Sequence, residues 1–260
     1  MERREFLTAS LAASALALTN QAQAQSTSGK PREYYELRRY HLQSGPQTKL
    51  TDAYVENALI PALNRLGIAP VGAFRLDYGP ETPVLYLLLP STNLETLVTA
   101  DLLLAKDAAF VKAAAPFWSA PAAAPPFQRI ESSLHIAFEG WPKVTPPAKE
   151  KRIFHMRTYE SPTNADHVRK VEMFHNGEFD FFAAAGAHSV FYGDALIGSR
   201  LPSLTYMLSF ADMDALNKSW DAFRANPGWK KLSSDPRYAS EPIVSNVTNL
   251  ILNPAPYSQI

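Results

Sequence analysis

The chain has 260 residues, of which 46% are hydrophobic and 19% are charged, a composition typical of a protein that buries a core. Lysine plus arginine and aspartate plus glutamate each number 25, and the absence of any basic run disfavours nucleic-acid binding. Cysteine is absent, which excludes disulfides, thiolate nucleophiles and cysteine-based metal sites.

The first segment has the three parts of a bacterial export signal. Arg3 and Arg4 precede a short apolar stretch, and Ala22-Gln23-Ala24 forms an A-x-A cleavage site. The apolar stretch is shorter than the ~20 residues that cross a bilayer. The arginine pair resembles a twin-arginine signal, although its flanks depart from that pattern and a general-secretion signal is the alternative. We expect cleavage after Ala24 and a periplasmic or secreted product without a stable membrane anchor.

The rest of the chain repeats itself at an offset of 119 residues, the separation between Arg38 and Arg157 and between Gly67 and Gly186. The identical positions fall at turns and at core positions, where backbone geometry restricts the sequence. The expected organisation is a signal peptide at 1–24, a first unit at 34–138, a proline-rich linker at 139–150 and a second unit at 151–253.

Each copy has the pattern of a strand, a helix, two strands joined by a glycine–proline turn, a second helix and a last strand. Glycine directly after the first helix of each copy is the expected stop signal. This βαββαβ order predicts an α+β protein of two tandem ferredoxin-like units. The strands are expected at 34–41, 71–78, 84–89, 130–138, 153–159, 189–196, 204–210 and 244–252, and the helices at 47–66, 94–114, 164–185 and 213–224.

The opening strands of the two copies, YELRRY from Tyr35 and FHMRTY from Phe154, resemble the first strand of NIPSNAP domains. The glycine-ended helix and the segment from Trp220 to Trp229 are also similar. The resemblance covers nearly the whole chain after the signal and is stronger in residues 151–253. It implies a dimeric α/β-barrel fold, in which two ferredoxin-like sheets pack face to face. It implies little about activity, because related barrels include small monooxygenases and haem proteins.

Side chains alternate between two faces along the opening strand of each copy. Tyr35, Leu37, Phe154 and Met156 share an apolar face, which we expect to pack on the helices. The other face is expected to point into the barrel, where a buried arginine needs a counter-charge or an acidic ligand. The ligand-binding candidates are Glu36, Arg38, Tyr40, His155, Arg157 and Tyr159, together with His188, which could reach the barrel mouth.

Three functions remain open at this level. The first is binding of a small carboxylate-bearing or aromatic ligand in the cavity between the two sheets. The second is a cofactor-independent monooxygenase- or isomerase-like enzyme with His155 or His188 as its acid–base residue. The third is a structural or partner-binding module with a filled barrel. No catalytic residue is assigned, no cofactor or metal is expected, and a homo-oligomer is compatible with the sequence.

Overall fold

The computed structural model describes residues 31–238 and 243–260, so the export signal predicted at 1–24 lies outside the described residues. Within them, no helix has both the length and the apolar character that crossing a membrane requires.

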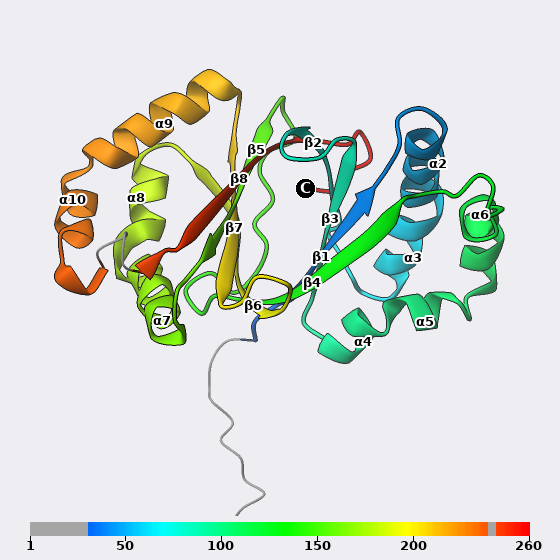
Figure 1. The fold of residues 1–260 in the computed structure, drawn as a ribbon, viewed down its shortest axis with the longest axis horizontal. Helices are drawn as coiled ribbons and strands as arrows, with labels where there is room; N and C mark the ends of the chain where they lie inside the picture. Colours follow the sequence, from blue (N-terminus) through cyan, green and yellow to red (C-terminus); the bar gives the residue numbers. More distant parts are fainter. Residues whose placement is uncertain (1–30, 239–242) are drawn as a thin grey trace, which may run out of the picture. The chain divides into compact units, whose positions relative to one another are not determined.

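Eight antiparallel strands close into one barrel in the order β1-β3-β2-β8-β5-β7-β6-β4 (Figure 1). The strands of each half of the chain stay together, and the halves join where β2 pairs with β8 and β4 pairs with β6. The predicted α+β class is confirmed, and each predicted strand is present within a few residues of its expected bounds. The strands are β1 (Tyr34–His41), β2 (Gly72–Tyr78), β3 (Val84–Ser91), β4 (Arg129–Ala137), β5 (Ile153–Glu160), β6 (His188–Ile197), β7 (Ser203–Phe210) and β8 (Asn246–Pro254).

Helices cover the barrel on two sides, those of the first half on one side and those of the second half on the other (Figure 1). The first helix of each half is interrupted at positions 119 residues apart, by a π-helical turn at η1 in the first half and by a kink at Asn176 and Gly177 within η2 in the second. The first half has α2 (Pro46–Tyr54), η1 (Val55–Leu59), α3 (Ile60–Arg65), α4 (Leu94–Val98), α5 (Ala100–Leu104) and α6 (Ala108–Trp118), and the second has α7 (Asn164–Met173), η2 (Phe174–Glu178), α8 (Phe179–Ala184), α9 (Met213–Ala225), α10 (Pro227–Ser233) and η3 (Pro236–Tyr238).

Capping side chains decide where the second helix of each half begins and breaks. Asn93 and Asp212 accept hydrogen bonds from the backbone of the first turns of α4 and α9, as their sequence positions suggest. The single helix expected over 94–114 is instead three helices, because Asp107 accepts from two backbone N–H groups and starts α6. Asn226 ends α9, one residue past Ala225, and its side chain then caps α10 directly.

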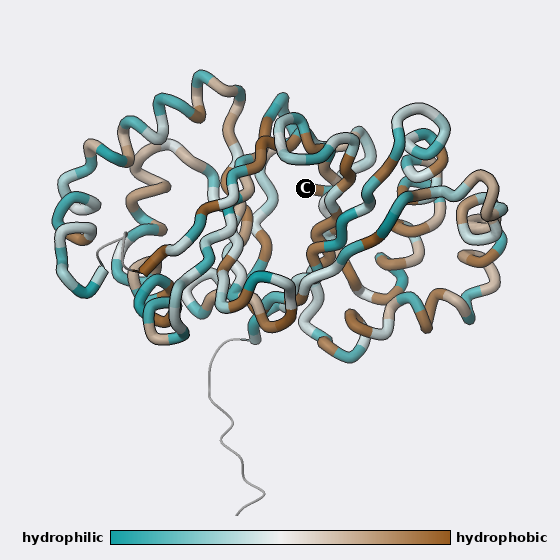
Figure 2. Tube along the Cα trace, viewed as in Figure 1, coloured by the Kyte–Doolittle hydropathy of each residue, from teal (hydrophilic) through white to brown (hydrophobic). Residues whose placement is uncertain are grey.

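Hydrophobic residues form one core inside the barrel and one beneath each group of helices. The inner core draws on all eight strands and includes Tyr35, Phe74, Phe154 and Phe191, with no helical residue. Its aromatic rings pack edge to face, with centroids 5.3 Å apart for Tyr35 and Phe191. In Figure 2, hydrophobic residues recur along the central strands, while the helices mix hydrophobic and hydrophilic residues. Both faces of the sheet are therefore buried over much of its area.

The prediction of which strand face points into the barrel was wrong. Tyr35 and Phe154 lie in the inner core, whereas Tyr40 belongs to the core beneath the first group of helices. The alternation was correct, but the rule that the apolar face packs on helices fails when both faces are covered. The candidates Glu36, Arg38, Tyr40, His155, Arg157 and Tyr159 consequently lie between the sheet and the helices, outside the barrel.

Candidate functional site

A pocket of about 440 Å³ lies between the sheet of the second half and helices α7 to α10. We call it the Arg157 pocket. Strand β5 contributes three side chains to the lining, His155, Arg157 and Tyr159, which alternate along the strand and therefore share a face. The helices supply charged and aromatic groups opposite them. Its principal lining residues are His155, Arg157, Tyr159, Lys170, Glu178, Phe182, Trp220, Phe223 and Trp229.

Arg157 is a partly buried cation held by aromatic rings. The guanidinium carbon lies 4.4 Å from the ring centroid of Trp220 and 5.1 Å from that of Tyr159. Its Nε is buried without a hydrogen-bond partner, and no carboxylate among residues 31–238 and 243–260 forms an ion pair with it. Burial opposes its charge, yet Tyr206, Tyr159 and Glu178 raise the pKa of Arg157 above its usual value. The pocket is therefore lined by a guanidinium that has no carboxylate partner among the described residues.

The other charged residues of the pocket have partners: Arg224 pairs with Asp221, and Lys170 and Glu178 neutralise each other. Lys170 and Glu178 are only 4% and 1% exposed, and the Lys170 Nζ lies 2.5 Å from Glu178 Oε1. Burial raises the pKa of Glu178, and the adjacent ammonium of Lys170 counteracts that rise. Lys170 Nζ also lies 4.8 Å from the ring centroid of Phe174. The charge of Arg157 is thus left over, which suits an anionic ligand.

His155 orients one wall of the pocket. The Trp220 Nε1–H donates to His155 Nδ1 at 3.2 Å, so the proton of the neutral ring lies on Nε2, which donates to Asn249 Oδ1 at 3.1 Å. Burial and then the charge of Arg157 lower the pKa of His155 from 6.5 to about 4. Both ring nitrogens are therefore engaged at neutral pH, and the ring fixes Trp220 over Arg157 without a nitrogen free for acid–base work.

The matching site in the first half is already neutral. Arg38 donates from Nε and Nη2 to the two carboxylate oxygens of Glu36, at 2.8 and 3.2 Å, and from Nη1 to Asp101 at 3.1 Å. Tyr40 packs against Phe117 in the helix-side core, with ring centroids 6.2 Å apart. The two equivalent arginines thus have different partners. Arg38 pairs with two carboxylates, whereas Arg157 pairs with none among the described residues.

The residues that create this difference are those at which the two copies diverge. At the offset of 119, His155 replaces Glu36 and Trp220 replaces Asp101, which removes both carboxylates that hold Arg38. The charged pair Lys170 and Glu178 replaces Thr51 and Leu59 in the same way. The sequence interpretation did not include Lys170, Glu178 or Trp220 among the ligand-binding candidates. The sequence did contain a signal for Lys170 and Glu178, because each is charged where the equivalent position of the first half carries an uncharged residue.

His188 does not join the other candidates. It opens β6, and its Nε2 lies 2.9 Å from the carbonyl oxygen of Thr145 in the segment between the halves. It is absent from the residues that line the Arg157 pocket and from those that line the cavity inside the barrel. The structure therefore separates His188 from His155 and Arg157.

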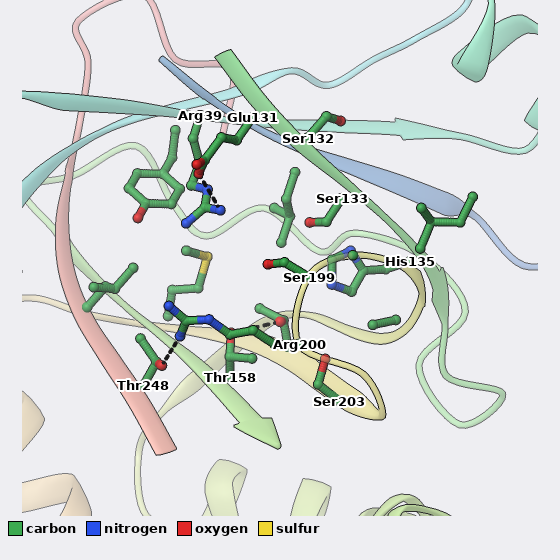
Figure 3. A pocket seen from close by; sticks show the side chains of 18 of the residues that line it. Arg39, Glu131, Ser132, Ser133, His135, Thr158, Ser199, Arg200, Ser203 and Thr248 are labelled. Carbon is green, nitrogen blue, oxygen red and sulfur yellow. Dashed lines mark hydrogen bonds and ion pairs between the residues drawn. The ribbon is translucent and has the colours of Figure 1, made fainter. Parts of the chain in front are cut away.

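A second cavity, of about 530 Å³, opens inside the barrel, and we call it the barrel cavity (Figure 3). The sequence predicted a cavity between the two sheets, but with other residues in its wall. Its lining includes Arg39, Glu131, His135, Thr158 and Arg200. Arg200 lies in the turn between β6 and β7, and the other four share the inward face of the strands with Leu37 and Met156, as the corrected alternation requires.

Acid is expected to destabilise the fold through His135 and His155. Burial lowers the pKa of both from 6.5 to about 4, so only the unfolded chain takes up protons as the pH falls below 6.5. Between pH 7 and pH 5 each histidine is expected to remove about 2 kcal/mol from the free energy of unfolding. The loss should level off below pH 4, where both states are protonated.

Urea denaturation at pH 7 and pH 5 measures this loss, and His135→Phe provides the matched comparison. Glu33 and Glu178 have a raised pKa and act in the opposite direction, so the difference between parent and variant isolates His135. The variant should lose about 2 kcal/mol less than the parent. Equal losses in the two proteins would contradict a neutral, buried His135.

Comparison with known proteins yields a family for the second half of the chain and a fold for most of it. A family model described as NIPSNAP matches residues 152–259. A candidate monooxygenase from Lactobacillus acidophilus has 10% identity and a TM-score of 0.56, covering 86% of this chain and 94% of its own. A candidate monooxygenase from Fusobacterium nucleatum has 9% identity and a TM-score of 0.58, with coverages of 86% and 92%. A NIPSNAP-like domain protein from Burkholderia xenovorans has 17% identity and a TM-score of 0.38, covering 42% of this chain and 90% of its own. No curated protein matches the chain.

Proposed function

Because this chain belongs to the NIPSNAP family, with its NIPSNAP domain at residues 152–259, and because that domain contains the Arg157 pocket, we propose that the protein binds a small organic anion there. The ligand has a carboxylate that pairs with Arg157 and a flat apolar body that lies among the aromatic rings.

The observation that carries this proposal is the unpaired guanidinium of Arg157 facing a pocket. A guanidinium matches a carboxylate with two parallel hydrogen bonds, which are stronger than those between neutral groups. Trp220, Phe182 and Phe223 supply apolar surface for the rest of the ligand. A volume of about 440 Å³ is in the range of small-molecule sites.

The architecture around the site fits a duplicated unit. Each half has the strand order fourth, first, third, second, as in β4-β1-β3-β2 and β8-β5-β7-β6. The interruption of the first helix at matching positions, η1 and η2, is a further similarity. We propose on this basis that the chain is two tandem ferredoxin-like units of the dimeric α/β-barrel type. From the arginine pair, the apolar stretch and the A-x-A site of residues 1–24, we propose that it is exported.

The enzyme alternative has less support. The candidate monooxygenases from Lactobacillus acidophilus and Fusobacterium nucleatum share the fold at 10% and 9% identity, which carries no statement about chemistry. An acid–base role requires a histidine with a free nitrogen near the ligand. His155 has both nitrogens engaged, and His188 bonds to the carbonyl of Thr145 outside the pocket.

Tryptophan fluorescence tests the proposed binding, since Trp220 and Trp229 line the pocket. We expect 4-hydroxybenzoate to change the emission of the chain from residue 25 onward in a saturable manner, with a dissociation constant that rises with salt. The neutral analogue 4-hydroxybenzyl alcohol, which keeps the ring and the hydroxyl, should not compete for this site. Absence of saturable binding, or equal affinity for both compounds at this site, would overturn the proposal.

A further inference from the structure

The barrel cavity has a wall unlike that of the Arg157 pocket. Figure 3 shows Ser133, Ser199 and His135 pointing into it from the strands and from the turn between β6 and β7. Leu37, Tyr86, Met156 and Leu250 provide an apolar floor. The cavity therefore combines hydroxyl groups with apolar surface, inside a barrel whose opposite end is closed by aromatic rings.

The charged groups at the mouth of this cavity are already paired. Arg39 Nη2 lies 2.6 Å from Glu131 Oε2. Arg200 donates to Thr248 Oγ1 at 3.0 Å and lies 3.6 Å from Glu160. These contacts appear as dashed lines from Arg39 and Arg200 in Figure 3, apart from the one to Glu160. Unlike Arg157, neither arginine leaves a positive charge without an acidic neighbour.

Several neutral polar groups in the cavity lack partners in the protein. His135 is 3% exposed, and its Nδ1 has no hydrogen-bond partner. Burial lowers the pKa of His135 to about 4, so the ring is neutral at physiological pH. The hydroxyls of Ser133 and Ser199 also form no hydrogen bond to another of the described residues. The hydroxyls of Ser133 and Ser199 therefore leave hydrogen-bonding groups open to an occupant of the cavity that they line.

We propose that the barrel cavity is a second ligand site, separate from the Arg157 pocket, for an uncharged hydroxylated small molecule with one apolar side. Ser133, Ser199 and His135 form hydrogen bonds with its hydroxyl groups, and the apolar side lies on Leu37 and Met156. A charged ligand does not fit this wall, because the paired arginines and glutamates offer no spare charge of either sign. The inference does not depend on the proposed anion site.

Ligand-observed NMR titrations with glycerol, glucose and 4-hydroxybenzyl alcohol test this inference. The variants are Ser133→Ala and His135→Phe, each of which removes a hydrogen-bonding group from the cavity. Ser132→Ala is the matched control: Ser132 also borders the cavity, but its hydroxyl is already engaged, because it donates to Glu36 Oε1 at 2.7 Å (Figure 3). Arg157→Leu controls for binding in the other pocket.

At least one neutral probe is expected to bind saturably, with a dissociation constant about fivefold higher in each cavity variant, since one hydrogen bond contributes ~1 kcal/mol. Ser132→Ala and Arg157→Leu should bind it as the parent does. The inference fails if no neutral probe binds saturably, because the cavity would then hold only water. It also fails if Ser132→Ala lowers the affinity for the probe as much as the cavity variants do. Loss of neutral-probe binding in Arg157→Leu would also overturn it, whereas loss of 4-hydroxybenzoate binding there concerns only the anion site. If His135→Phe unfolds, Ser133→Ala decides the outcome.

Discussion

Replacing Arg157 by leucine is expected to weaken binding of 4-hydroxybenzoate roughly 10- to 100-fold, since hydrogen bonds to a charged group contribute about 1.5–3 kcal/mol. The fold should tolerate the change, because no described carboxylate loses a partner and leucine suits a site between aromatic rings. We expect the free energy of unfolding to change by less than about 1 kcal/mol. Fluorescence titration and urea denaturation measure the two quantities on the same protein.

The matched control is the equivalent arginine of the first half. The double variant Glu36→Leu with Arg38→Leu removes both members of a bidentate ion pair at once. It should leave the affinity for 4-hydroxybenzoate unchanged. Glu241 lies outside the described residues, so Glu241→Gln is included to test whether it competes for Arg157. Unchanged binding in Arg157→Leu, or equal loss in the first-half variant, would refute the assignment of the anion site. An unfolded Arg157→Leu protein would favour a structural role for the arginine.

Glu178→Leu is expected to lower the free energy of unfolding by about 3–5 kcal/mol, because it leaves the buried ammonium of Lys170 without its partner. Glu178 is the carboxylate that neutralises Lys170, and both are almost fully buried beneath the helices of the second half. Lys170 and Arg157 would then both lack a carboxylate partner in a pocket lined by aromatic rings. Urea denaturation at pH 7 provides the measurement.

The double variant Lys170→Thr with Glu178→Leu separates lost charge pairing from lost packing. It gives the second half the residues that the first half carries at the same positions, Thr51 and Leu59. We expect it to be far more stable than Glu178→Leu and close to the parent, since replacing both members of a buried ion pair is often neutral. If the double variant is as unstable as the single one, the shape of the site and not its charge is what Glu178 maintains.

Most of the local structure could be predicted from the sequence because it depends on short-range geometry. Gly67 and Gly186 end their helices with positive φ angles, +78° and +83°, which only glycine adopts at little cost. Asn93 and Asp212 cap the next helices as expected. The break at Asp107 was missed, because the apolar spacing on both sides of it fits one continuous helix.

The candidate site was predicted in part. The repeat showed that Arg38 and Arg157 occupy equivalent positions. It also showed that the two halves differ close by, where Glu36 in the first half corresponds to His155 in the second. The sequence could not show that the divergence leaves Arg157 unpaired, because the partners of Arg38 include Asp101, which is 63 positions away. Nor could it show that His188 lies apart from the site.

By itself, the sequence determined the order of the strands along the chain, the repeat at an offset of 119 residues and the alternation of side chains, since each depends on residues close together or on the repeat. Only the tertiary structure decided which face of each strand points into the barrel. Closure buries both faces, and hydrophobicity then no longer distinguishes them. The contacts that define the site follow from that decision, as in the bond between Trp220 and His155, which are 65 positions apart.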